Sequence, residues 1–193
     1  MINIKNLSSV IDIGCGTGNT SLELYRKYPN ADYTLCDISR KMLDIAVSKF
    51  PFAVNTICCD AENYEFPKYD LAISNLSIQW FASPNKFIQK ARNHFKTFAF
   101  SVLVDTAFKK YKSNFDFFPK FEYPSIKELE REVGKNYRIN DYNLEFENFF
   151  DLTKYFIKLG AYARSNLKPV FKNYCGKKIT LDYKIFIGIL DNS

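Results

Sequence analysis

The sequence predicts an α/β fold with a mostly parallel, doubly wound sheet, a C-terminal antiparallel hairpin and a small helical lid. Short apolar runs alternate with amphipathic segments between residues 10 and 104, a glycine-rich turn follows the first run, and two β-rich runs come late in the chain. The length of 193 residues suits one domain spanning 1–193. We expect lid-like insertions at about 106–135 and 147–176.

Five strands and three helices are predicted in the first half. Apolar or β-branched runs indicate strands at 10–13, 32–36, 55–59, 69–75 and 98–104. Helical spacing indicates helices at 21–28, 41–50 and 85–95. Pro29 closes the first helix, while Ser39 caps the second and Pro51 stops it. The strand at 98–104 is almost wholly apolar, as expected of a strand buried on both faces.

The regular alternation of predicted strands and helices ends after residue 104. Pro124 opens a predicted helix over 125–133, and strands are predicted over 137–146 and 179–190. A helix over 152–159 lies between these strands, so the pattern favours an antiparallel hairpin with an inserted helix.

Composition narrows the class of protein. The chain is 47% apolar and 25% charged, without the roughly 18 uninterrupted apolar residues of a membrane span. The N-terminus lacks the pattern of a secretory leader, so we expect a cytoplasmic protein without a membrane partner. The cysteines number five, with no C-x-x-C pair, and His94 is the single histidine. We therefore expect reduced, mostly buried thiols and no metal site.

The net charge of +6 comes from 27 Lys and Arg against 21 Asp and Glu. A basic surface suits nucleic acid, an acidic protein or an anionic substrate. The basic residues are spread along the chain, which favours an ordinary solvated exterior over a binding patch. We expect a monomer.

Polar residues follow four successive predicted strands. The turn Gly14–Gly18, Asp37, Asp60 and Asn75 each come just past a strand. Since ligands of doubly wound sheets bind beyond the carboxyl ends of the strands, these residues are expected to converge on one crevice.

The glycine turn favours one kind of ligand. Gly14, Gly16 and Gly18 allow a tight turn and a close approach of the backbone to a ligand. A dinucleotide fingerprint requires its third glycine one residue later, where Asn19 stands. Asp12 repels a phosphate but attracts the ammonium group of a methionine moiety.

The acids behind the turn extend this interpretation. Asp37 ends the second strand about twenty residues after the turn, where a carboxylate accepts hydrogen bonds from ribose hydroxyls. Asp60, followed by Ala61, is placed to accept from an exocyclic adenine amine. Ile38 and Met42 are expected to sandwich the adenine. Taken singly, each acid is also explained as a helix cap or a turn residue.

These motifs resemble those of class I S-adenosylmethionine-dependent methyltransferases, which have a Rossmann-like fold. The resemblance is carried by VIDIGCGTG at 10–18, CDIS at 36–39 and CDAE at 59–62. The run YDLAISNLSIQW at 69–80 is similar to the fourth-strand signature of malonyl-acyl-carrier-protein O-methyltransferases of biotin synthesis. FSVLVD at 100–105, FEYPS at 121–125 and LGA at 159–161 follow in that family's order.

The resemblance implies S-adenosylmethionine as cofactor and methyl transfer to the free carboxyl of a malonyl thioester. Acyl carrier protein, or coenzyme A, is then the carrier, and no nucleic acid is expected. Members of that family carry some tens of residues before the first strand that help to close the site, whereas nine residues precede Val10 here. Either the lid is built from another part of the chain or the start is truncated.

The chemistry points to a few further residues. A malonyl carboxylate titrates near about 4 and is ionised at neutral pH, so no general base is required and His94 is interpreted as structural. Gln79 and Trp80 follow the fourth strand and are expected to face the transferred methyl. Candidates for holding the acceptor carboxylate are Arg164, Tyr111 and Tyr123. Plain packing is the competing interpretation of Trp80, and surface exposure that of Arg164.

Two other functions stay open. Superfamily motifs fix the cofactor but not the acceptor, so another small molecule is an alternative substrate. A base-modifying DNA enzyme is disfavoured, because Asn75 is followed by Leu76 and Ser77 instead of two prolines and an aromatic residue. The second alternative is a degenerate, non-catalytic methyltransferase-like binding protein.

Overall fold

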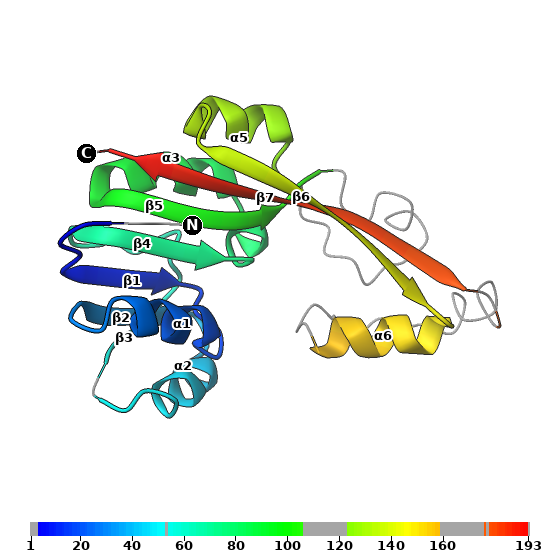
Figure 1. Cartoon of the computed structure of the whole chain (residues 1–193), viewed down its shortest axis with the longest axis horizontal. Coiled ribbons are helices and arrows are strands. Elements are labelled where there is room, and N and C mark those ends of the chain that lie inside the picture. The colour runs from blue at the N-terminus through cyan, green and yellow to red at the C-terminus, as the bar shows by residue number, and fades with distance from the viewer. Residues whose placement is uncertain (1–3, 53, 106–122, 159–175, 177, 193) are drawn as a thin grey trace.

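The fold is one seven-stranded sheet with helices on both faces, seen in a computed structural model (Figure 1). The structure describes residues 4–52, 54–105, 123–158, 176 and 178–192, with the side chains of 156–158 left out. The strand order is β3-β2-β1-β4-β5-β7-β6. The order reverses between β1 and β4, which places a crevice at the carboxyl ends of these strands.

The first five strands are parallel. They are β1 (Ser9–Ile13), β2 (Asp32–Asp37), β3 (Asn55–Cys58), β4 (Tyr69–Asn75) and β5 (Phe95–Leu103). The pairing of Ile13 with Cys36, and of Asp37 with Cys58, brings the ends of β1, β2 and β3 to one edge. The predicted parallel sheet is confirmed.

Two helices cover one face of the sheet. They are α1 (Asn19–Lys27) and α2 (Arg40–Val47). Tyr25 of α1 packs with Val10 and Tyr33, and Leu43 of α2 packs on Leu35. The Ser39 side chain accepts from Met42 N at 3.4 Å, so it caps α2 as predicted.

Two other helices cover the opposite face. They are α3 (Pro84–His94), which follows the short 3₁₀ helix η1 (Ile78–Trp80), and α5 (Ile126–Val133). Phe87 and Leu129 from these helices join Ile11, Ile13 and Phe98 in the main core cluster. Ser125 and Glu128 form a capping box that starts α5.

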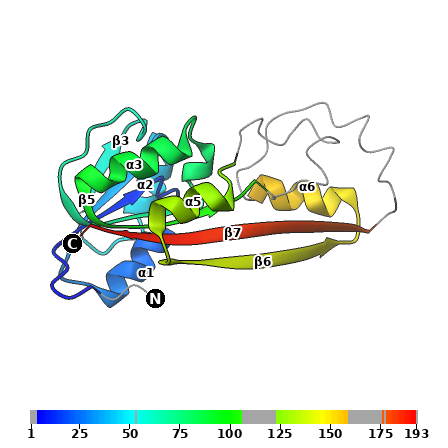
Figure 2. The ribbon, with the colours of Figure 1, turned by 90° about the horizontal axis from the view of Figure 1, so that it is seen from above.

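The C-terminal hairpin is confirmed. Strand β7 (Ile179–Asp191) pairs antiparallel with both β5 and β6 (Tyr137–Phe146), and α6 (Phe149–Lys158) lies between the hairpin strands in the sequence. The pairing with β5 ends at Ile185, whereas that with β6 continues to Ile179. The outer part of the hairpin therefore projects from the sheet as a ribbon with α6 beside it (Figure 2).

Several predicted boundaries differ from the structure by one to three residues: α2 ends at Val47 and not at residue 50, and α6 begins at Phe149 and not at residue 152. The sequence placed a gap between the helix ending at Phe95 and the strand starting at Phe98, but β5 begins at Phe95 directly after α3. The reason is that Phe95 is buried and pairs with Tyr69, so its backbone is already extended.

The described residues contain no helix long and apolar enough to cross a bilayer. Within the same residues, no group of three or more His, Cys, Asp and Glu side chains is arranged to hold a metal ion.

Candidate active site

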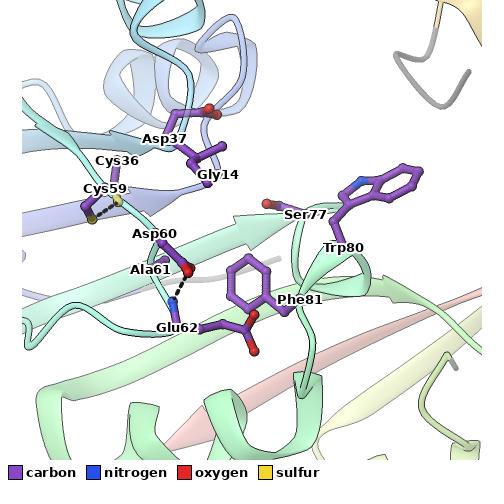
Figure 3. A pocket seen from close by; sticks show the side chains of 11 residues that line it. Gly14, Cys36, Asp37, Cys59, Asp60, Ala61, Glu62, Ser77, Trp80 and Phe81 are labelled. Atoms are coloured by element: carbon purple, nitrogen blue, oxygen red, sulfur yellow. Dashed lines mark hydrogen bonds between the residues drawn. The ribbon is translucent and has the colours of Figure 1, made fainter. Parts of the chain in front are cut away.

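A cavity of about 350 Å³ opens at the carboxyl ends of the parallel strands (Figure 3). One wall, here called the nucleoside wall, comes from β1, β2 and β3, and consists of Gly14, Cys36, Asp37, Ile38, Cys59, Asp60 and Ala61. The other wall, here called the β4 wall, consists of Ser77, Trp80 and Phe81, and Glu62 lies between the two. A pocket of this size, apolar with a few polar groups, suits a small-molecule cofactor.

The glycine turn is shaped by contacts that exclude a side chain. Gly14 has φ of 67°, and a Cβ there would lie 1.7 Å from Ser77 Oγ. Gly18 has φ of 76°, and its Cβ would lie 2.9 Å from the Cβ of Ala46. At Gly16, with φ of 53°, nothing lies within 4 Å. The turn is thus packed at both ends and open in the middle, as a backbone cradle for a ligand requires.

Asp37 is fixed by the backbone on both sides. Its Oδ2 accepts from Gly16 N at 2.9 Å, and its Oδ1 accepts from Ser39 N at 2.8 Å. Each carboxylate oxygen retains a second lone pair, so the side chain is oriented and still able to accept from a ligand hydroxyl.

Asp60 is held in a similar way. Its Oδ1 accepts from Glu62 N at 3.0 Å and its Oδ2 from Asn63 Nδ2 at 2.7 Å. It is exposed and lines the cavity beside the buried Ala61. The turn interpretation of this acid is therefore confirmed, while its contact with a ligand stays a prediction.

Asp12 lies under the turn and does not line the described cavity. It is 2% exposed and accepts a hydrogen bond from Ser21 Oγ. Burial raises its pKa to about 7, and the nearby charge of Asp37 adds to this, while the Ser21 hydrogen bond opposes it. A positive ligand group above the turn would favour the ionised form.

Four other predicted residues lie outside the cavity lining. Met42 is exposed on α2, and Gly16 and Gly18 belong to the glycine turn without lining the cavity. Asn75 connects β4 to its neighbours, because its Nδ2 donates to Thr20 Oγ1 at 3.1 Å and its Oδ1 accepts from Ser101 Oγ.

Gln79 is also absent from the lining, although its neighbour Trp80 belongs to it. Gln79 is 3% exposed, and its Nε2 donates to Leu76 O at 2.6 Å. Leu76 has φ of 51°, a left-handed conformation that is rare for a branched side chain. Leu76 N in turn donates to Ser101 O at 3.1 Å. Gln79 therefore helps to hold a strained turn just before Ser77.

The structure describes one of the three residues that were predicted to hold the acceptor carboxylate. Arg164 and Tyr111 lie outside the described residues. Tyr123 is 6% exposed, and burial raises its pKa to about 12. His94 Nδ1 is 2.6 Å from Phe66 O, and His94 does not line the cavity.

Five residues that line the cavity were not predicted from the sequence to belong to the site: Cys36, Cys59, Glu62, Ser77 and Phe81. Cys36 and Cys59 immediately precede the two acids at the strand ends, which is the signal that would have revealed them. Their sulfurs lie 3.7 Å apart, and burial raises the pKa of both thiols. Both therefore behave as neutral packing groups at neutral pH.

The fold and the site define a Rossmann-like protein with a nucleoside-type pocket at the topological switch point. A family model described as a methyltransferase domain matches residues 10–97. A malonyl-[acyl-carrier protein] O-methyltransferase of Neorickettsia risticii is 27% identical over 96% of this chain and 80% of its own length.

Two further comparisons agree. A malonyl-[acyl-carrier protein] O-methyltransferase 2 of Ilyobacter polytropus is 30% identical over 89% of this chain and 77% of its own length. The solved plantazolicin methyltransferase BpumL, in complex with S-adenosylhomocysteine, has a TM-score of 0.53 and 17% identity, and covers 95% of this chain and 77% of its own. The chain belongs to the class I S-adenosylmethionine-dependent methyltransferases, and S-adenosylmethionine is its cofactor.

Proposed function

We propose that this chain methylates the free carboxyl of a malonyl thioester carried on acyl carrier protein, as a step of biotin synthesis. The observation that carries the proposal is the similarity to malonyl-[acyl-carrier protein] O-methyltransferases over 96% and 89% of the chain. The basic net charge of +6 also suits an acidic carrier protein.

The cofactor fits the nucleoside wall. Asp37 would accept from the ribose hydroxyls, and Asp60 from the adenine amine, with Ile38 and Ala61 as apolar contacts. The Gly14–Gly18 turn would pass beneath the methionine moiety, whose ammonium group would draw Asp12 to its ionised form. When bound, the cofactor supplies a sulfonium methyl group for in-line displacement.

The chain positions the two reactants and provides apolar surface around them. A malonyl carboxylate is already an anion at neutral pH, so no residue has to remove a proton. Phe81 and the partly exposed Trp80 supply apolar surface to the cavity, and the Ser77 hydroxyl lines it next to Gly14. Arg164 is proposed as the cation that orients the carboxylate, with Gln79 supporting the strand end from inside.

The experiment is a set of parallel turnover assays. Purified protein is given S-adenosylmethionine and malonyl-acyl-carrier protein, malonyl-coenzyme A or free malonate, and the methyl ester is measured by mass spectrometry. Asp37→Ala serves as the cofactor-binding control. We expect ester only with a malonyl thioester, and rescue of growth without biotin in a strain lacking the enzyme. A well-folded protein that binds cofactor but gives neither result contradicts the proposal.

A different small-molecule acceptor is the second candidate. The plantazolicin methyltransferase has the same fold and is named for another acceptor, so the fold by itself leaves the acceptor open. Methyl transfer to a panel of small carboxylates and amines, with malonyl thioesters inert, would select it.

A further inference from the structure

Glu62 joins the two walls of the cavity. Its Oε2 accepts from Ala82 N at 2.7 Å and its Oε1 accepts from Ser83 N at 2.8 Å. Glu62 itself follows β3, whereas Ala82 and Ser83 come directly after Phe81 of the β4 wall. Figure 3 shows its carboxylate reaching away from Asp60 toward the segment that bears Phe81.

The two hydrogen bonds satisfy the start of α3. Ser83 is the N-cap of this helix but makes no side-chain capping bond, and Pro84 in the first turn has no N–H group to donate. The Glu62 carboxylate instead accepts from the N–H group of the N-cap residue and from that of the residue before it, and its negative charge is favourable near a helix N-terminus. Bonds from backbone N–H groups to a carboxylate are among the stronger protein hydrogen bonds.

Further contacts fix Glu62 on the nucleoside wall. Its backbone N–H donates to Asp60 Oδ1 at 3.0 Å, so the same residue also orients the proposed adenine-binding acid. Lys90 of α3 donates to Glu62 O at 3.3 Å and to Tyr64 O at 2.6 Å. The segment that carries Asp60 is thus attached to α3 at two points along the helix.

We propose that Glu62 is a positioning residue that sets the separation of the two walls, so that the loop carrying Trp80 and Phe81 is aligned with the cofactor. The proposal deepens the methyltransferase function above and rests on it for its kinetic effect. Glu62 does not need to touch the reacting atoms, because it acts through Ala82, Ser83 and Asp60.

The test compares Glu62→Ala and Glu62→Gln with a matched control, Glu65→Gln. Glu65 is a carboxylate of the same loop with its side chain 78% exposed; it forms an ion pair with Lys90 at 3.0 Å, and its Oε2 lies 3.3 Å from His94 Nε2. We expect Glu62→Ala to lower kcat for the malonyl acceptor at least tenfold while the S-adenosylhomocysteine Kd changes less than threefold. Glu62→Gln retains one acceptor oxygen and should recover part of kcat, and the control should match the wild type.

A second readout does not depend on the acceptor. Trp80 is the only tryptophan in the chain, so intrinsic fluorescence reports the β4 wall directly. We expect acrylamide to quench Trp80 about twice as efficiently in Glu62→Ala as in the wild type or in Glu65→Gln, without cofactor. This result supports the proposal even if no malonyl acceptor is methylated, so the two proposals fail separately.

Two results would overturn the positioning role. One is unchanged quenching in folded Glu62→Ala and Glu62→Gln. The other is an equal loss of kcat and of S-adenosylhomocysteine affinity that follows the fall in melting temperature, which indicates a purely structural role. If Glu62→Ala does not fold, Glu62→Gln decides between these outcomes.

Discussion

Replacement of Asp12 by Asn should remove a pH dependence of stability. Asp12 has a pKa of about 7 in the folded protein against an ordinary value of 3.8, because it is buried. Between these pH values the folded protein binds a proton that the unfolded chain has lost, so the free energy of unfolding falls as the pH rises from about 4 to about 7. At about 1.36 kcal/mol per pKa unit, this loss amounts to as much as about 4 kcal/mol.

The assay is urea unfolding of the wild type and Asp12→Asn at several pH values from 4 to 8. Asn keeps an oxygen that can accept from Ser21 Oγ but does not titrate. Taking the difference between the two proteins cancels other acids, such as Asp70, whose pKa is lowered by Lys96 and by Ser8. A difference that stays constant across this range would refute the reasoning.

Three further predictions concern the site and the elements that support it. Asp37→Ala should weaken S-adenosylhomocysteine binding by about 1 to 3 kcal/mol in calorimetry, and unchanged affinity would remove Asp37 from the site. Gly16→Ala should destabilise the protein by about 1 to 2 kcal/mol through backbone strain alone. Gly14→Ala should destabilise it more, because the added Cβ also collides with Ser77. Equal urea midpoints for the two variants would contradict this. Ser125→Ala should lower the free energy of unfolding by about 1 kcal/mol, because the capping box of α5 is lost. The affinity for S-adenosylhomocysteine should stay unchanged, and a weaker affinity would show that this cap also influences cofactor binding.

The layout of the site could be predicted because it follows from chain direction. Parallel strands end at one edge of the sheet, so Gly14, Asp37 and Asp60 had to converge once their strands were recognised. The hairpin was equally predictable from its two long β-rich runs around a helical segment.

The details that escaped prediction depend on side-chain direction. The sequence does not show that Phe81 points into the cavity. Met42 is exposed on α2 and outside the cavity lining, and its expected contact with the adenine stays a prediction. The reach of Glu62 to Ala82 and Ser83 spans about twenty residues of chain and leaves no local pattern. Gln79 follows the strand end as predicted, yet it is buried and bonded to Leu76, because a left-handed residue there requires support.

The most direct test of the central claim is a crystal structure of the protein with S-adenosylhomocysteine. We expect the ribose hydroxyls on the Asp37 carboxylate, the adenine beside Ile38 and Asp60, and the amino acid part over the Gly14–Gly18 turn. A nucleoside bound elsewhere, or Asp37 turned away from the sugar, would contradict it.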